Sequence, residues 1–283
     1  MPTFPTPNPI QIQLDIGAGD ARISTGDQPE TTVDVAPRDA SRHADVRAAE
    51  QTRVDFTDGR LVVRTPRQGF SLGRGGVIDV TISAPAGSRL DGHTGAGDLA
   101  TDGALGDVSF RSGAGQIRMG SAGAVKLAVG AGDISVQHAA GDARVTTGSG
   151  AVRIGGIERA AVIKSGNGPT VIGAADGSVR VVTANGDISI DHAGADVVAK
   201  TANGHLRVGE AVRGALELST ATGNIDVGIA AGTAARLDVR TQFGHVDQQL
   251  EASDGPPASG EKLEVRGRTS FGNITISRAV AVS

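Results

Sequence analysis

The sequence contains no cysteine, no tryptophan and no tyrosine, and only six phenylalanines and two methionines among 283 residues. Without thiols, the chain cannot form a disulfide, a zinc–thiolate site, an iron–sulfur cluster or a cysteine nucleophile. The scarcity of aromatic rings leaves few platforms on which a sugar could stack. The core must therefore consist of aliphatic side chains.

Long apolar runs and strong net charge are also missing. No stretch of about 18 apolar residues occurs, and residues 1–9 lack the basic and apolar regions of a signal peptide. We therefore expect no transmembrane segment and a cytoplasmic location. The formal net charge of -4 argues against a protein that mainly binds nucleic acid, because such proteins are usually basic.

Glycine, in contrast, is abundant, with 42 residues. A turn of the form Gly/Ala-x-Gly returns about every 18 residues, which is typical of a solenoid with one repeat per coil. Its second glycines are Gly97, Gly115, Gly132, Gly150, Gly168, Gly186, Gly204 and Gly223, with weaker copies at Gly244 and Gly272.

Apolar residues alternate with polar residues on both sides of each turn, as at Val179 and Val181 before Gly186 and at Ile188 and Ile190 after it. A period of two predicts strands. The inward parity changes across the glycine, so the chain turns a corner there, and a second corner must close the coil. The sequence therefore predicts an all-β, single-stranded β-solenoid with parallel sheets and coils of about 18 residues. It leaves open whether each coil has two faces or three.

The N-terminal part contains the same unit in a less regular setting. Ile12, Leu14 and Ile16 lead into a turn at Gly19, which predicts a first coil. Strands are expected at 31–35, 53–56, 61–64 and 77–82, separated by a polar segment at 37–50 and a loop at 66–76. We interpret residues 1–93 as a loop-bearing N-terminal cap that includes this first coil, and residues 94–283 as regular repeats of one continuous domain.

The C-terminal part has a longer connection. Residues 248–262, rich in glycine and proline, are expected to form a surface loop inserted into the penultimate coil. Phe243 and Phe271, which occupy the weaker turns, are expected to face inward at corners.

The repeated pattern Gly-x-Gly-[Asp/Asn]-[Ile/Leu/Val]-x-[Val/Ile], together with the segment at 77–87, resembles a bacterial β-strand-repeat family called putative adhesins or toast-rack domains. The resemblance covers nearly the whole chain. It implies a right-handed, β-helix-like solenoid and a role related to the cell envelope. It implies no catalytic residue.

Several columns of polar residues run along the repeats. Asp20, Asp98, Asp133 and Asp187 follow turn glycines but do not occupy adjacent coils, so they cannot clamp shared calcium ions, and we expect them to accept backbone N–H groups. Threonine and serine three residues before the glycine, as at Thr201, are expected to bond to turn amides. The histidines lie too far apart along the stack to share a zinc ion. We therefore predict no metal and no cofactor.

Two function classes remain. Polysaccharide lyases and glycoside hydrolases use β-helices, but they combine paired carboxylates with aromatic platforms or basic clusters, and the aromatic part is scarce here. We therefore predict a non-catalytic scaffold or interaction module with no catalytic residue, and keep a carbohydrate-active enzyme as the alternative.

The charged residues suggest where such a module would bind. Outward positions before the turn glycine are net basic, and those after it, including Asp98, Asp187, Asp191 and Asp226, are net acidic. A file of cations about 5 Å apart could contact an anionic surface, although charges also keep a flat sheet soluble. The expected partner is an unidentified protein or an anionic envelope component, and a homo-oligomer is left open. The candidate contact residues are Arg111, Lys126, Arg144, Lys164, Arg180, Lys200 and Arg240.

Overall fold

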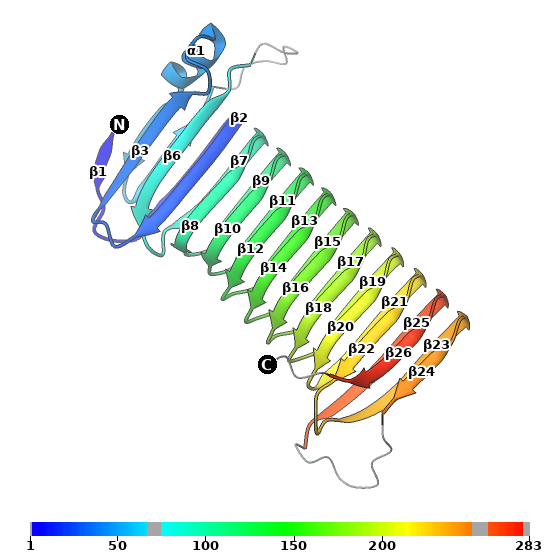
Figure 1. Cartoon of the computed structure of the whole chain (residues 1–283). Helices are drawn as coiled ribbons and strands as arrows, with labels where there is room; N and C mark the ends of the chain where they lie inside the picture. The colour runs from blue at the N-terminus through cyan, green and yellow to red at the C-terminus, as the bar shows by residue number, and fades with distance from the viewer. Residues whose placement is uncertain (1, 67–74, 251–259, 280–283) are drawn as a thin grey trace. The chain divides into compact units, whose positions relative to one another are not determined.

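A computed structural model of the chain describes residues 2–66, 75–250 and 260–279 (Figure 1). Its contacts group into two compact units, Met1–Ala140 and Gly141–Ser283. The boundary expected at residue 94, between an N-terminal cap and the regular repeats of one continuous domain, is a different one and stays a prediction.

Both units consist of the same coil, with one strand before the turn glycine and one after it. The strands before the glycine form sheet B and those after it form sheet A, so each regular coil has two faces. Strands of the same sheet run parallel, as when Val179 pairs with Ala161 and with Val197 in the neighbouring coils. This confirms the predicted all-β solenoid with parallel sheets.

The elements of the first unit are β1 (Thr3–Pro5), β2 (Gln11–Gly26), β3 (Glu30–Pro37), α1 (His43–Gln51), β4 (Arg53–Thr57), β5 (Arg60–Arg64), β6 (Ile78–Pro85), β7 (Arg89–Ala96), β8 (Leu99–Leu105), β9 (Val108–Ala114), β10 (Ile117–Ala122), β11 (Val125–Ala131) and β12 (Ile134–Ala139). Those of the second unit are β13 (Ala143–Ser149), β14 (Val152–Ile157), β15 (Ala161–Asn167), β16 (Thr170–Ala175), β17 (Val179–Asn185), β18 (Ile188–Ala193), β19 (Val197–Asn203), β20 (Leu206–Ala211), β21 (Gly214–Thr222), β22 (Ile225–Ile229), β23 (Ala234–Phe243), β24 (Val246–Gln249), β25 (Lys262–Phe271) and β26 (Ile274–Arg278).

The core lies between the two sheets and is aliphatic. Ile163, Val181 and Ala199 occupy the same position in successive strands of sheet B and are buried. In sheet A, Ile172 and Ile190 likewise occupy the same position in successive strands and are buried. Parallel stacking places like residues on one another, and β-branched side chains suit this arrangement. The alternation in the sequence therefore identified the core.

The corner between the sheets explains the turn glycine. Gly186 has a φ of 142°, which side chains disfavour. A Cβ there would overlap the carbonyl oxygen of Gly168 in the preceding coil. Glycine is thus required both by the backbone conformation and by the close approach of successive coils.

Antiparallel strands close the N-terminal end of the first unit. β3 pairs with β6 and with β1, and β4 pairs with β5, all antiparallel. Phe4 on β1 and Phe56 on β4 stack with ring centroids 5.1 Å apart. The four strands expected here correspond to β3, β4, β5 and β6.

The segment at 37–50 contains a helix that the sequence did not predict. In α1 only Asp45 and Ala48 are buried, so the segment has no apolar stripe. Asp45 fixes the helix by accepting the backbone N–H of Val77 at 3.0 Å. Most of the loop expected at 66–76 lies outside the described residues.

The order of coils changes at the C-terminal end of the second unit (Figure 1). β25 lies between β21 and β23, and β26 lies between β22 and β24. The last coil of the sequence is therefore inserted between the two coils that precede it. The connection expected at 248–262 is not inserted into a coil: it follows β24, which ends at Gln249, and leads to β25, which begins at Lys262. Its residues 251–259 lie outside the described part of the chain.

Phe243 and Phe271 also differ from expectation. Their rings stack with centroids 4.9 Å apart and are 57% and 55% exposed. They do not face inward, because turn residues of successive coils project away from the core.

Candidate functional site

The outer face of sheet B in the second unit carries four cations on four successive strands. β13, β15, β17 and β19 contain neither Asp nor Glu. Because inward and outward side chains alternate, the buried aliphatic residues force the intervening positions outward. We call the outward side chains Arg144, Lys164, Arg180 and Lys200 the basic face.

The register arranges these cations in a zigzag. Arg144 and Arg180 share one row with Val162 between them, and Lys164 and Lys200 share the adjacent row with Val182 between them. Cations of one row are therefore two coils, or about 10 Å, apart. The single file with a spacing of about 5 Å is thus wrong, because the residues occupy two different positions of the repeat.

The carboxylates that form ion pairs with the basic face lie at its two ends. Lys200 pairs with Glu217 of β21 at 2.5 Å, and Arg144 pairs with Asp142 at 3.9 Å. Lys164 and Arg180 form no ion pair with a described residue. The hydrogen bond from Lys200 lowers the pKa of Glu217. Two central cations thus remain available to an external anion.

The other three candidates lie elsewhere. Arg111 on β9 aligns with His93, which in turn aligns with Asp15, so its surroundings in the first unit are of mixed charge. Lys126 lies on β11. Arg240 lies on β23 and pairs with Asp238 at 3.3 Å. Within the second unit, the structure thus places four of the seven predicted residues on successive strands, those of the basic face.

The outer face of sheet A in the second unit carries mixed charge and a groove of about 760 Å³. Asp191, Asp226 and Arg207 line it, and Gly209 and Gly228 leave its floor without side chains. The groove was not predicted from the sequence. The sequence feature that could have indicated it is a second set of repeated glycines, each five residues after a turn glycine: Gly155, Gly173, Gly209 and Gly228.

Three polar side chains of the groove, His192, Glu210 and Arg278, are already engaged. His192 Nδ1 lies 2.9 Å from Glu210 Oε2, and Arg278 Nη1 donates to the carbonyl oxygens of Ala230 and Thr233 at 3.0 Å. No group of three or more His, Asp or Glu side chains that could hold a metal ion occurs in the described ranges.

A second hollow, of about 570 Å³, lies in the first unit and was not predicted either. It lies between Ala48 of α1, Asp15 of β2 and His93 of β7. Thr65 and Gly75 also line it, and they flank a segment outside the described residues. We build no site on it.

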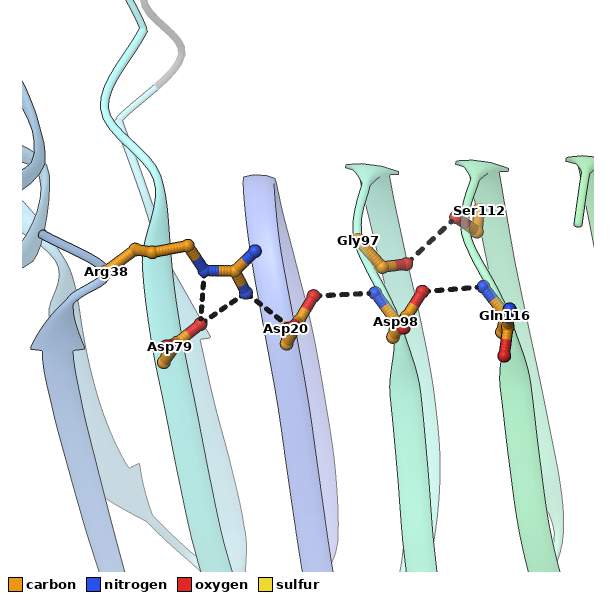
Figure 2. A network of polar contacts seen from close by, with 7 residues as sticks. All are labelled: Asp20, Arg38, Asp79, Gly97, Asp98, Ser112 and Gln116. Atoms are coloured by element: carbon orange, nitrogen blue, oxygen red, sulfur yellow. Dashed lines mark hydrogen bonds and ion pairs between the residues drawn. The ribbon is translucent and has the colours of Figure 1, made fainter.

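The aspartates after the turn glycines lie at the corner, where they join successive coils (Figure 2). Asp20 Oδ1 accepts the backbone N–H of Asp98 at 2.9 Å, and Asp98 Oδ1 accepts that of Gln116 at 2.7 Å. Arg38 pairs with Asp20 and, at 2.6 Å, with Asp79. The predicted capping role is confirmed. Asp98 therefore belongs to the corner and not to an outer face. The expectation that these aspartates do not occupy adjacent coils is wrong for Asp20 and Asp98, because β2 pairs directly with β8.

Asp187 has the same role in the second unit, where it accepts the backbone N–H of His205 at 2.7 Å. We expect Asp187→Ala to lower the free energy of unfolding by about 1–2 kcal/mol, because the N–H loses a charged acceptor. Asp187→Asn should retain most of the stability, since Asn224 and Asn273 serve as acceptors at the same position. Urea unfolding followed by circular dichroism would measure both. Equal losses in the two variants would contradict the acceptor role.

The buried hydroxyl column is structural, but its partners differ from expectation. Thr201 Oγ1 donates to the carbonyl oxygens of Asn203 and Gly186, both at 3.2 Å. Ser112, Thr220 and Thr269 likewise donate to turn carbonyls, whereas the hydroxyls of Thr94, Thr147 and Ser165 have no partner among the described residues. The turn amides are not available to this column, because they already pair with the next coil, as Gly186 N–H does with Asn203 O.

Comparisons with known proteins agree with the fold. The family model described as Toastrack DUF4097 matches residues 11–277. No curated relative matches the chain. The helix in the described residues is not long and apolar enough to cross a membrane, and the cytoplasmic location stays a prediction.

Solved structures with a similar arrangement have low sequence identity. One, a putative adhesin from Parabacteroides distasonis ATCC 8503, has 12% identity, covers 97% of this chain and 95% of its own, and gives a TM-score of 0.40. A putative adhesin from Bacteroides fragilis NCTC 9343 has 12% identity, covers 97% of this chain and 95% of its own, and gives a TM-score of 0.36. A putative lipid binding protein from P. distasonis ATCC 8503 has 12% identity and the same two coverages, and gives a TM-score of 0.34. These likenesses carry no argument about what this chain binds.

Proposed function

The chain belongs to the Toastrack DUF4097 family, and we propose that it is a non-catalytic interaction module that binds an anionic lipid surface through the basic face. The observation that carries this proposal is the run of four strands, β13, β15, β17 and β19, with one outward cation each and no carboxylate. A flat sheet presents these cations together to a planar array of phosphates.

The residues between the cations favour a lipid surface over a soluble polyanion. Val162, Val182 and Val198 are outward and half-buried, so hydrocarbon separates the charges. Each Lys or Arg near an anionic leaflet contributes about 1 kcal/mol. Four such residues contribute about 4 kcal/mol, which corresponds to a dissociation constant of about 1 mM for one copy. The attachment is therefore weak and reversible.

Vesicle sedimentation tests the proposal. We expect the protein to bind phosphatidylcholine vesicles that contain phosphatidylserine, and to dissociate as salt rises, because charges are screened over about 8 Å at physiological ionic strength. The triple variant Lys164→Glu, Arg180→Glu, Lys200→Glu should bind at least about 100-fold more weakly, since it loses about 3 kcal/mol of attraction and gains repulsion.

Matched variants separate the basic face from net charge. Arg153→Glu, Arg159→Glu and Arg207→Glu change three exposed arginines of the second unit outside sheet B. This variant has the same net charge as the first and should bind nearly as wild type. Glu217→Gln should strengthen binding, because it releases Lys200. If the two triple variants lose binding equally, or if a soluble polyphosphate binds while vesicles do not, the proposal fails.

The carbohydrate-active enzyme remains the alternative, and the groove on sheet A is where it would act. Asp191 and Asp226 both line this groove. No phenylalanine, tyrosine or tryptophan is among its lining residues in the described part of the chain. We therefore favour the interaction module.

A further inference from the structure

The second unit ends in a coil whose outer edge is open. Among the described residues, β23 pairs only with β25, and β24 only with β26. The backbone N–H of Ala234 donates to Glu261 O, on the β25 side. Because successive strand residues direct their polar groups to opposite sides, those of Leu237 and Val239 point away from β25. A row of unpaired donors and acceptors therefore lines the edge.

The described residues also leave the core uncovered at this end. Leu237 and Val239 stand at core positions but are only half-buried, and Val246 on β24 is 40% exposed. The N-terminal end of the first unit, in contrast, is closed by antiparallel strands and a pair of stacked phenylalanines. Long, uncovered edges invite pairing with another chain.

The charges along β23 indicate which chain would fit. Arg236, Asp238 and Arg240 alternate in sign on the outer face of the strand. If a second copy of β23 pairs antiparallel with the first about a centre at Val239, Asp238 of each copy lies opposite Arg240 of the other. In this arrangement Val239 of one copy lies opposite Val239 of the other. The edge is thus complementary to itself.

The other strand of the coil agrees with this centre. Val239 lies five residues before Gly244 and Gln248 lies four residues after it, so one axis perpendicular to the sheets passes near both. Asp247 then lies opposite Gln249 of the second copy, a pairing of an acceptor with a donor. A foreign peptide strand could cover one of the two edges, whereas a second copy covers both.

We propose that two copies of the chain join end to end through β23 and β24, related by a two-fold axis perpendicular to the sheets, so that both sheets continue as antiparallel pairs. Such an interface is isologous, with the same residues on both sides. The pairing does not depend on the proposed function. Since the axis is perpendicular to the sheets, the basic faces of the two copies point in the same direction. That both faces then contact one lipid surface rests on the proposed function.

Mass measurement without lipid tests the pairing independently of vesicle binding. Light scattering after size exclusion should give twice the 28.4 kDa of one chain at concentrations where the dimer forms. Asp238→Arg places arginine opposite arginine, and Arg240→Asp places aspartate opposite aspartate. Each single variant should associate at least tenfold more weakly than wild type. The double variant Asp238→Arg, Arg240→Asp should recover the dimer, because it exchanges the two charges.

Mixing the variants tests the register most directly. Asp238→Arg and Arg240→Asp, each monomeric alone, should form a dimer when mixed, since one supplies two arginines and the other two aspartates. As a control, Asp226→Arg and Arg207→Asp, on adjacent strands of sheet A, should leave the mass unchanged. A wild-type mass of one chain at every concentration overturns the proposal. So does a dimer that the single changes do not weaken, or a failure of both the double variant and the mixture to dimerise.

Discussion

Replacing Gly186 by alanine is expected to lower the free energy of unfolding by about 3–5 kcal/mol, or to prevent folding of the second unit. The φ of 142° already disfavours any side chain, and the new Cβ would overlap the carbonyl oxygen of Gly168. Both atoms belong to corners held on either side by backbone hydrogen bonds, such as Gly186 N–H to Asn203 O at 2.8 Å. The corner therefore cannot move without opening the stack.

Gly194→Ala is the matched control, because this glycine stands at the second corner of the same coil. It has no positive φ, and a Cβ there would lie 3.3 Å from its nearest neighbours. We expect a loss below about 1 kcal/mol. Gly209, outside the repeated turn, is a poorer control, since its Cβ would lie 2.7 Å from Asp191 O. Equal urea midpoints for Gly186→Ala and Gly194→Ala would contradict the assigned role of the turn glycine.

The second large effect is expected in the core of the first unit, where Phe110→Ala should lower the free energy of unfolding by about 3–5 kcal/mol. Phe110 is 1% exposed. It pairs in register with Gly92 of the preceding coil, and its ring fills the space above that glycine, since a Cβ on Gly92 would lie 2.5 Å from the ring. An otherwise aliphatic stack accommodates this ring because its neighbour has no side chain.

A double-mutant cycle tests this explanation. Gly92→Ala alone should destabilise by about 1–3 kcal/mol through overpacking. Combined with Phe110→Ala, the same methyl group enters the vacated space. The double variant should therefore be more stable than the sum of the single losses predicts, by about 1 kcal/mol or more. Additive losses in urea unfolding would show that the two positions are not coupled.

The parts of the fold that were predictable depend on short-range patterns. Alternation around Gly186 identified the core positions of both sheets, and the turn glycine itself marked the corner. The order of the last coils has no such pattern, because Leu237 on β23 and Val265 on β25 each lie seven residues before their turn glycine, Gly244 and Gly272. Either strand satisfies the local requirements of a place beside β21. The choice is made by contacts between segments far apart in sequence.

The candidate site was predictable to a similar degree. That the cations point outward followed from the alternation, but their zigzag required the register, which places Arg180 beside Val198 and Lys200 beside Val182. The open edge of β23 could not be predicted at all, because nothing in the sequence of that strand says that it is the last of the stack. α1 was missed because its burial involves a single aspartate and a single alanine, Asp45 and Ala48.

The exchanged order of the last two coils has a consequence for how the chain is completed on the ribosome. Coils up to β22 can each be added to the preceding one as they emerge, which is how repeat proteins grow. The coil of β23 and β24 emerges next, but its place is beside β25 and β26, which have not yet been translated. It must wait, with its apolar face uncovered, until β25 and β26 have left the exit tunnel. The last two coils are therefore assembled out of the order in which they are synthesised.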